Sequence, residues 1–405
     1  NISYGIHLIK KYLVNYRNVT VLIIFSVVFG FAKNVVLGRM LSISDFGVYY
    51  LSLSVIGIFS ALLLFGQQKG IIRFFIRKNV NDYDWKTPIL IQLFISIPIT
   101  VILLPIISNY YNVDFAFTYF CVCVIVSTVI TDLLINVVRA SGKFELALIL
   151  QRMIRVILAI TAIVFLISNV FRLSFIFFFF GSFHFIYGAF VYYYVVRKIN
   201  IGSNKVPLSS QKEGLYFSAI DIISLINMYG INLIIAEILS IDYLGIFFAF
   251  HIILRIYEIF AQSTDFVTMP SSKEIDRPGL IIIIIKNLII GSGVSLFFLI
   301  FGDHLVSLIY LKKYDEYLNL IPLICLIGQV KMMDSIPLSI VSGISNKTIL
   351  KRYVRYNSIF TIIFILGSIL LINYFGLIGA PYALIILHLL RSIYGFRILY
   401  ERYKY

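Results

Sequence analysis

The sequence predicts an all-α polytopic membrane protein of about twelve transmembrane helices. These are expected to form two six-helix bundles, in a parallel pseudo-twofold repeat around a central cavity. Three observations support this fold class: the composition, a series of long apolar runs and an internal repeat. Of the 405 residues, 60% are hydrophobic and 13% are charged. Soluble domains contain about 45–50% apolar and about 25% charged residues, so the composition indicates a membrane protein.

Twelve apolar runs are long enough to cross a bilayer, since about 20 helical residues span the hydrocarbon core. The predicted spans are 18–37, 46–67, 87–108, 115–137, 152–170, 173–196, 215–239, 244–269, 280–302, 318–341, 354–375 and 378–400.

Lys and Arg gather at the N-terminus, in every second connection and in the C-terminal tail, to which we assign Arg391, Arg397, Arg402 and Lys404. The formal net charge is +15. Basic residues accumulate on the cytoplasmic side of membrane proteins. We therefore expect a multi-pass membrane protein with both termini in the cytoplasm. The charge then reflects topology, and no nucleic acid is expected as a partner.

An internal repeat relates the two halves of the chain. Residues 39–50 read RMLSISDFGVYY and residues 237–248 read EILSIDYLGIFF, which places matching residues 198 positions apart. That offset covers six spans, an even number, so both halves enter the membrane in the same direction. Such repeats are related by an axis along the membrane normal, with substrate held between the halves. We expect one bundle over residues 1–206 and the other over 207–405.

The eighth span, LGIFFAFHIILRIYEIFAQSTDFVTM, carries one polar stripe. At about 100° per residue, its five polar residues fall within roughly 80° of one helix face. They are His251, Arg255, Glu258, Gln262 and Asp265. A charge at the bilayer centre costs about 2.5–3.5 kcal/mol even on the most lenient scale. We therefore expect the stripe to face other helices or an aqueous cavity.

Two interpretations of these polar residues are open. In the first, Arg255 and Lys33 of the first span bind an anionic substrate, because Arg offers a planar fork of donors and Lys a point charge. Glu258, Asp265 or Glu237 would then exchange H⁺ or bind Na⁺. In the second, Arg255 and Glu258 only neutralise each other, while His251 and Gln262 bond to neighbouring helices.

Other polar residues within spans favour structural roles. This interpretation applies to Asp132, to Lys286 and to the pair Lys331 and Asp334, and His388 is expected to pack or pair. The three cysteines, Cys121, Cys123 and Cys325, lie in apolar runs and are expected to pack rather than bind metal. No nucleotide-binding, zinc-protease or nucleophile-elbow motif is present. We expect a transporter without a cofactor rather than an enzyme.

Several stretches resemble the polysaccharide repeat-unit flippases of the Wzx type, within the multidrug/oligosaccharidyl-lipid/polysaccharide exporter superfamily. They are RMLSISDFGVYYLSLSVIGIFSALLLFG, RASGKFELALI, YLGIFFAFHIILRI and NYFGLIGAPYALII. Each stretch alone is weakly specific, because it is largely apolar with glycines at intervals. Their order through nearly the whole chain is more specific than any one stretch.

The resemblance implies an alternating-access flippase that moves an undecaprenyl-diphosphate-linked oligosaccharide across the bacterial cytoplasmic membrane. It also implies basic residues on helices 1, 2 and 8 that hold the diphosphate. Lys33 and Arg255 match helices 1 and 8, and Gln262 lies on the same face as Arg255. The middle of the second span lacks a basic residue, a departure for which Arg39 is the expected substitute. Glu258, Asp265, Glu237 and His251 would couple transport or balance charge. A polysaccharide polymerase and a chain-length regulator would be partners.

Two other classes of function, an exporter and a membrane-embedded enzyme, stay open on the sequence. A multidrug or small-molecule exporter of the same superfamily would favour an acidic cavity, which Lys33 and Arg255 oppose. A polysaccharide polymerase or an acyltransferase would need a large extracytoplasmic loop or catalytic histidines, and the short loops and scattered histidines oppose both. The sequence does not distinguish O-antigen from capsule or other surface polysaccharide, H⁺ from Na⁺, or one sugar from another.

Overall fold

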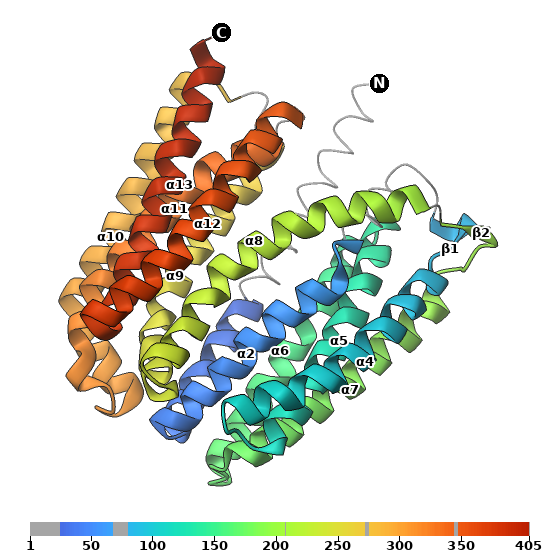
Figure 1. The fold of residues 1–405 in the computed structure, drawn as a ribbon, viewed down its shortest axis with the longest axis horizontal. Coiled ribbons are helices and arrows are strands. Elements are labelled where there is room, and N and C mark those ends of the chain that lie inside the picture. Colours follow the sequence, from blue (N-terminus) through green and yellow to red (C-terminus); the bar gives the residue numbers. More distant parts are fainter. Residues whose placement is uncertain (1–24, 68–79, 207, 272–274, 344–346, 405) are drawn as a thin grey trace. The chain divides into compact units, whose positions relative to one another are not determined.

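The computed structural model describes residues 25–67, 80–206, 208–271, 275–343 and 347–404, which are almost entirely helical (Figure 1). Residues 25–40 are helical. The later helices are α2 (Ile43–Leu64), α4 (Lys86–Tyr110), α5 (Phe115–Ala140), α6 (Phe144–Ile167), α7 (Leu173–Lys198), α8 (Leu208–Ile238), α9 (Ile241–Ser271), α10 (Arg277–Tyr310), α11 (Ile321–Gly343), α12 (Lys347–Phe375) and α13 (Gly379–Lys404). Each predicted span overlaps one of these helices, so the all-α polytopic fold class is confirmed.

Short elements connect some of the helices. They are the 3-10 turns η1 (Val80–Asp82), η2 (Asp315–Leu320) and η3 (Gly376–Ile378), and the two-residue strands β1 (Tyr83–Asp84) and β2 (Asn204–Lys205). Within the described residues, nine runs of helix are long and apolar enough to cross a membrane, one of them covering both α12 and α13. The chain is therefore a multi-pass membrane protein.

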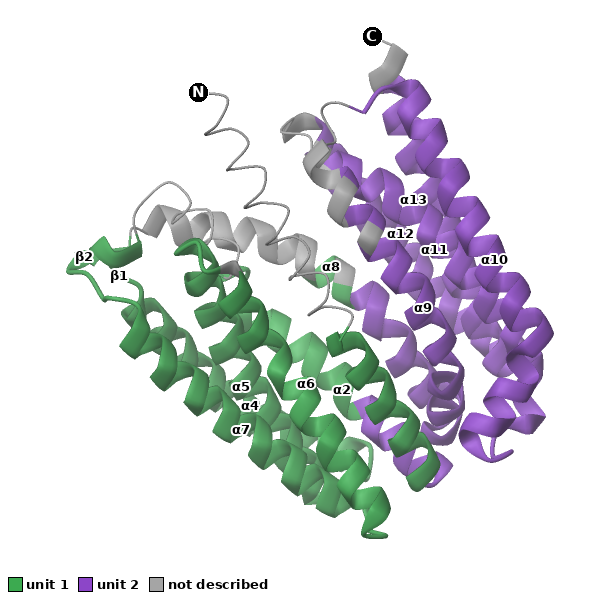
Figure 2. Cartoon of the chain, turned by 180° about the vertical axis from the view of Figure 1, so that it is seen from behind, with its two compact units in different colours: residues 1–41, 52–225 green, residues 42–51, 226–405 purple. Residues whose placement is uncertain are grey.

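The described chain forms two compact units (Figure 2). Unit 1 consists of residues 1–41 and 52–225, and unit 2 of residues 42–51 and 226–405. The helix α2 thus begins in unit 2 and continues in unit 1, and α8 is divided at Leu225. Each unit has its own buried helices.

In unit 1 the central helix is α5, which packs against α4, α6 and α7. Small residues allow the close approach of α7. A Cβ atom at Gly188 would lie 2.7 Å from Ser127 Oγ, and the Ser127 hydroxyl donates a hydrogen bond to the His184 carbonyl at 2.6 Å. Glycine and serine at helix contacts are typical of membrane bundles, where packing rather than water exclusion drives association. Cys121 and Cys123 are buried in α5 with free thiols.

A short two-stranded pairing, here called the clip, lies outside the long helices of unit 1. The strands β1 and β2 pair in parallel, with Tyr83 opposite Asn204 and Asp84 opposite Lys205. Beside them Trp85, the only tryptophan of the chain, is 1% exposed and donates its indole N–H to the Asn200 carbonyl at 3.1 Å. The segment between α7 and α8, which joins the two halves of the sequence, is therefore fastened to unit 1.

In unit 2 the helices α9 and α11 are the most buried, and α10 and α13 pack against α11. The opposite face of α10 is apolar and exposed, for example at Ile282, Ile289 and Leu308. Lipid tails solvate such a face in a bilayer, where the intrahelical hydrogen bonds satisfy the backbone. The start of α10 is capped by Asp276, whose side chain accepts a hydrogen bond from the Gly279 amide at 2.8 Å.

The two copies of the sequence repeat meet in unit 2 in a reciprocal contact. A Cβ atom at Gly47 would lie 2.0 Å from the Ile241 carbonyl oxygen, and one at Gly245 would lie 2.3 Å from the Ile43 carbonyl oxygen. Gly47 and Gly245 are matching positions of the repeat, as are Ile43 and Ile241. The glycine in each copy thus lets the start of α2 and the start of α9 touch through their backbones.

Candidate functional site

The predicted polar stripe lies on a single unbroken helix, α9, so its five residues share one face as expected. Burial along the stripe varies. Glu258 is buried, His251, Arg255 and Asp265 are half-buried, and Gln262 is exposed. The part of the face that enters the protein is therefore centred on Glu258, and the described contacts of α9 there are with α11 and α10.

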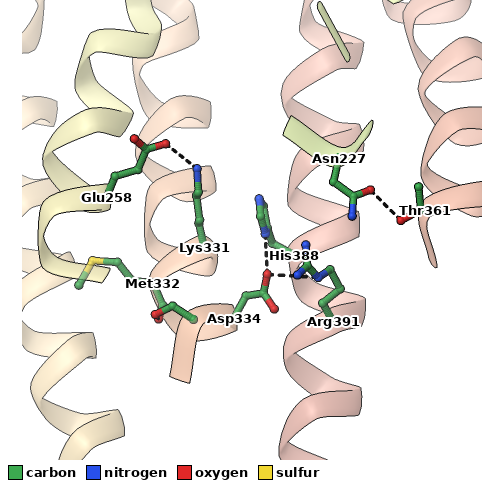
Figure 3. A network of polar contacts seen from close by, with 9 residues as sticks. Asn227, Glu258, Lys331, Met332, Asp334, Thr361, His388 and Arg391 are labelled. Carbon is green, nitrogen blue, oxygen red and sulfur yellow. Dashed lines mark hydrogen bonds and ion pairs between the residues drawn. The ribbon is translucent and has the colours of Figure 1, made fainter. Parts of the chain in front are cut away.

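Glu258 bridges two cations on two helices. Its Oε2 accepts a hydrogen bond from Arg255 Nη1 at 2.7 Å, one turn earlier on α9. Its Oε1 accepts from Lys331 Nζ of α11 at 2.6 Å (Figure 3). The exposed fractions of the side chains are 10% for Glu258, 42% for Arg255 and 31% for Lys331. The carboxylate is thus the inner member and both cations retain an open side.

This cluster of Arg255, Glu258 and Lys331, hereafter the cation pair with its carboxylate, has an excess of positive charge. Two cations meet one carboxylate, so the formal charge is +1. His251, Tyr50 of α2 and Tyr229 of α8 also lie within electrostatic range of Arg255. The Arg255 guanidinium and the Lys331 ammonium have further N–H donors beyond those given to Glu258. The arrangement can therefore bind an anion on the open side of the cations.

Packing one turn from the cluster sets the approach of α9 and α11. A Cβ atom at Gly328 of α11 would lie 2.4 Å from Cγ and Cδ2 of Tyr257. Tyr257 is fully buried and its hydroxyl lies 2.8 Å from Ser295 Oγ of α10, so the ring is fixed at both ends. Only glycine at position 328 leaves room for this ring, and the close contact brings Lys331 within reach of Glu258.

Farther along the same face, α9 and α11 are joined by a second polar contact. The Ser339 hydroxyl of α11 donates a hydrogen bond to the Asp265 carboxylate. On α9 the neighbouring Thr264 hydroxyl donates to Asn287 of α10 at 3.1 Å. Asp265 is thus held by a neutral donor, unlike Glu258.

A second polar network joins α11 to α13. Asp334 Oδ2 is 2.9 Å from His388 Nδ1 and 3.5 Å from Arg391 Nε, both on α13 (Figure 3). The side chains are 6% exposed for Asp334 and 11% exposed for His388 and Arg391. The negative charge of the Asp334 carboxylate cancels the positive charge of the Arg391 guanidinium. The network therefore has no net formal charge as long as His388 is unprotonated. Nearby, the Thr361 hydroxyl of α12 donates to Asn227 Oδ1 of α8 at 2.8 Å.

The structure groups some of the sequence-predicted site residues and separates others. Arg255, Glu258 and His251 lie together in unit 2. Glu237 is exposed near the end of α8. Lys33, half-buried in the helical segment 25–40, and the exposed Arg39 belong to unit 1. Lys33 lies within electrostatic range of His184 of α7.

Sequence reasoning did not find the contacts of two functional candidates, Lys331 and Arg391. Lys331 was expected to be structural with Asp334, but it pairs with Glu258 of α9. His388 was expected to pack or pair, and it pairs with Asp334. Arg391 was grouped with the basic residues of the C-terminal tail, without a partner, and it contacts the buried Asp334. A signal was available in each case, because Lys331 and Asp334, like His388 and Arg391, occur three residues apart in apolar helices and so share a face.

Comparisons with known proteins bear on the fold. No protein-family model matches the sequence, and no curated protein matches it. Among solved structures, an inward-facing multidrug resistance MATE family transporter of the MOP superfamily superposes with a TM-score of 0.67, at 13% identity over 92% of this chain and 94% of that one. The outward-facing form of a MATE family transporter gives a TM-score of 0.61, at 14% identity over 96% and 94%.

A third solved structure is a MOP superfamily transporter from Pyrococcus furiosus whose description reports a binding pocket of reverse polarity and suggests a different function. It matches with a TM-score of 0.64, at 13% identity over 94% of both chains. The chain therefore has the fold of the MATE transporters of the MOP superfamily.

Proposed function

We propose that this protein is an alternating-access flippase for an undecaprenyl-diphosphate-linked oligosaccharide, acting in the bacterial cytoplasmic membrane with both termini in the cytoplasm. Its cargo would be a repeat unit for O-antigen or another surface polysaccharide. The observation that carries the proposal is the cation pair with its carboxylate: two cations, 42% and 31% exposed, held by one buried Glu258.

Electrostatics favours an anionic cargo at this place. An uncompensated cation within a membrane-spanning segment is costly and is typically found where it serves a substrate pathway. A diphosphate oxygen is a good acceptor for the guanidinium fork of Arg255, and the Lys331 ammonium adds a second donor. The cargo head group would supply the counter-charge that Glu258 alone does not provide.

Export of small molecules is the second candidate function, because the multidrug resistance MATE transporters compared above have the same fold. The fold supports a small-molecule exporter as well as it supports a flippase. The formal charge of +1 at the cluster disfavours cationic compounds, so an exporter of this type would carry anionic ones. H⁺ or Na⁺ coupling fits both candidates, and a polymerase and a chain-length regulator are the partners expected for a flippase.

The test is transport by the purified protein in proteoliposomes. We expect translocation of a fluorescent polyprenyl-diphosphate oligosaccharide, and its loss in Arg255→Ala and Lys331→Ala. Each removed charge-assisted hydrogen bond is worth about 1.5–3 kcal/mol, roughly a 10- to 100-fold loss of affinity. Lys286→Ala is the matched control, because Lys286 is an exposed cation of α10. Export of cationic dyes without movement of the diphosphate lipid, or full activity in both variants, would overturn the proposal.

A further inference from the structure

The ionised state of Glu258 depends on the two cations that would also bind cargo. The residue is 8% exposed, and each carboxylate oxygen has one cationic partner, Arg255 or Lys331. A buried carboxylate is unfavourable in its charged form unless it is paired and hydrogen-bonded. Any ligand that draws the donors of Arg255 and Lys331 toward itself therefore weakens the stabilisation of the Glu258 charge.

We propose that binding of a dianionic head group to Arg255 and Lys331 is accompanied by uptake of one proton on Glu258. This inference rests on the proposed function, in that it takes the cargo to be a diphosphate. The charge count agrees. With Glu258 ionised, the occupied cluster would carry a formal charge of −1, whereas with Glu258 protonated it is neutral. Cargo and proton thus bind together, and Glu258 changes from a partner of the cations to a neutral group.

Among the described residues around Glu258, His251 is the one other group that could accept the proton. The titratable groups that face the cluster are His251 on α9, Tyr50 on α2 and Tyr229 on α8, beside Arg255 and Lys331 themselves. His251 is flanked by the Phe247 and Phe248 rings, at centroid distances of 6.0 and 4.9 Å. It has no direct bond to either cation among the contacts described, so a ligand on the cations leaves its hydrogen bonding unchanged. Glu258, in contrast, must share both of its cationic partners with the ligand.

Asp334 is a poorer place for the proton, although it is also buried. Its direct contacts are with His388 and Arg391 of α13, and Lys331 acts on it only at longer range. A ligand held by Arg255 and Lys331 leaves both contacts in place. The charge of Asp334 thus remains compensated whether the site is occupied or empty.

The test is calorimetric binding of a synthetic diphosphate diester that carries a short isoprenoid and one sugar. Such a diester keeps its two negative charges across the pH range studied, so any proton taken up belongs to the protein. Titration in two buffers of different ionisation enthalpy gives the number of protons bound. We expect uptake approaching one proton, and for wild-type protein a fall in Kd of up to about tenfold per unit decrease in pH.

Variants assign the proton. Glu258→Gln should bind the diester with no proton uptake and a Kd independent of pH, while His251→Gln should behave like wild type. Glu316→Gln, which changes an exposed carboxylate of η2 outside the cluster, is the matched control. Uptake that persists in Glu258→Gln, or wild-type binding without uptake at any pH, would overturn this inference and leave the proposed function intact. Absence of diester binding by wild-type protein would overturn both. If Glu258→Gln does not fold, the wild-type measurement alone decides whether linkage exists.

Discussion

Gly328→Ala should uncouple Lys331 from Glu258 without touching either residue. The new Cβ would lie 2.4 Å from Cγ and Cδ2 of Tyr257 and 2.7 Å from its Cε2, whereas carbon atoms pack at about 3.5–4.0 Å. Tyr257 cannot turn away, because it is fully buried and its hydroxyl contacts Ser295. The helices α9 and α11 must therefore separate by about 1 Å.

Overpacking of this size costs about 1–3 kcal/mol, and the same shift would stretch the 2.6 Å contact between Lys331 and Glu258. We expect a lower melting temperature of the purified protein and weaker diphosphate binding. Gly293→Ala in α10 is the control, since nothing lies within 4 Å of its new Cβ, and it should be neutral or slightly stabilising. Adding Tyr257→Ala to Gly328→Ala should relieve the clash and recover part of the binding. Unchanged stability and binding in Gly328→Ala would refute the proposed packing constraint.

Three further outcomes follow from the contacts. Gly47→Ala and Gly245→Ala should each lower the melting temperature, and the double variant should be less destabilised than the sum, because both changes part the same pair of backbones; additive effects would contradict the reciprocal contact. Gly202→Ala should separate β1 from β2, because the new Cβ would lie 2.0 Å from the Asp82 carbonyl carbon. The fluorescence emission of Trp85, the sole tryptophan, should then move to longer wavelength, and Gly367→Ala should leave it unchanged. Asp84 lies outside the spans and accepts hydrogen bonds from the Lys86 and Thr87 amides at 3.2 and 3.1 Å. Partial burial raises the pKa of Asp84, but the hydrogen bonds lower it by more, so the folded-state pKa lies below the unfolded value. The stabilisation by the Asp84 carboxylate is therefore full above about pH 4 and is lost as the pH falls through the folded-state pKa. The stability difference between wild type and Asp84→Asn should accordingly vanish in acid, and a constant difference would contradict this role.

Periodicity and hydropathy were enough to predict the helices, because a membrane-spanning segment must satisfy its own backbone and present apolar side chains to lipid. The repeat was also readable, and the glycine shared by residues 39–50 and 237–248 proved to be a point of backbone contact. The parallel pairing of β1 with β2 was not predictable, since two-residue strands carry no periodic pattern and their partners are distant in sequence.

The polar stripe of α9 was predictable as one helix face, but its partners were not. A sequence pattern gives the face of a residue and not the neighbouring helix, so Glu258 could be matched with Arg255 on its own helix but not with Lys331 on α11. For the same reason Asp334 was paired with Lys331, three residues earlier, whereas its contacts are with His388 and Arg391 of α13. Tertiary contacts between helices decide which charges cancel and which remain.

The charge of the preferred ligand is the most direct measure of what the cation pair with its carboxylate does. Equilibrium binding to the purified protein should be compared for three probes with the same isoprenoid and sugar, joined by a diphosphate, a neutral linker or a cationic linker. We expect the diphosphate probe to bind most tightly, with its advantage reduced roughly 10- to 100-fold in both Arg255→Ala and Lys331→Ala and retained in Lys286→Ala. Equal binding of the three probes, or preference for the cationic one, would contradict an anionic cargo held by Arg255 and Lys331.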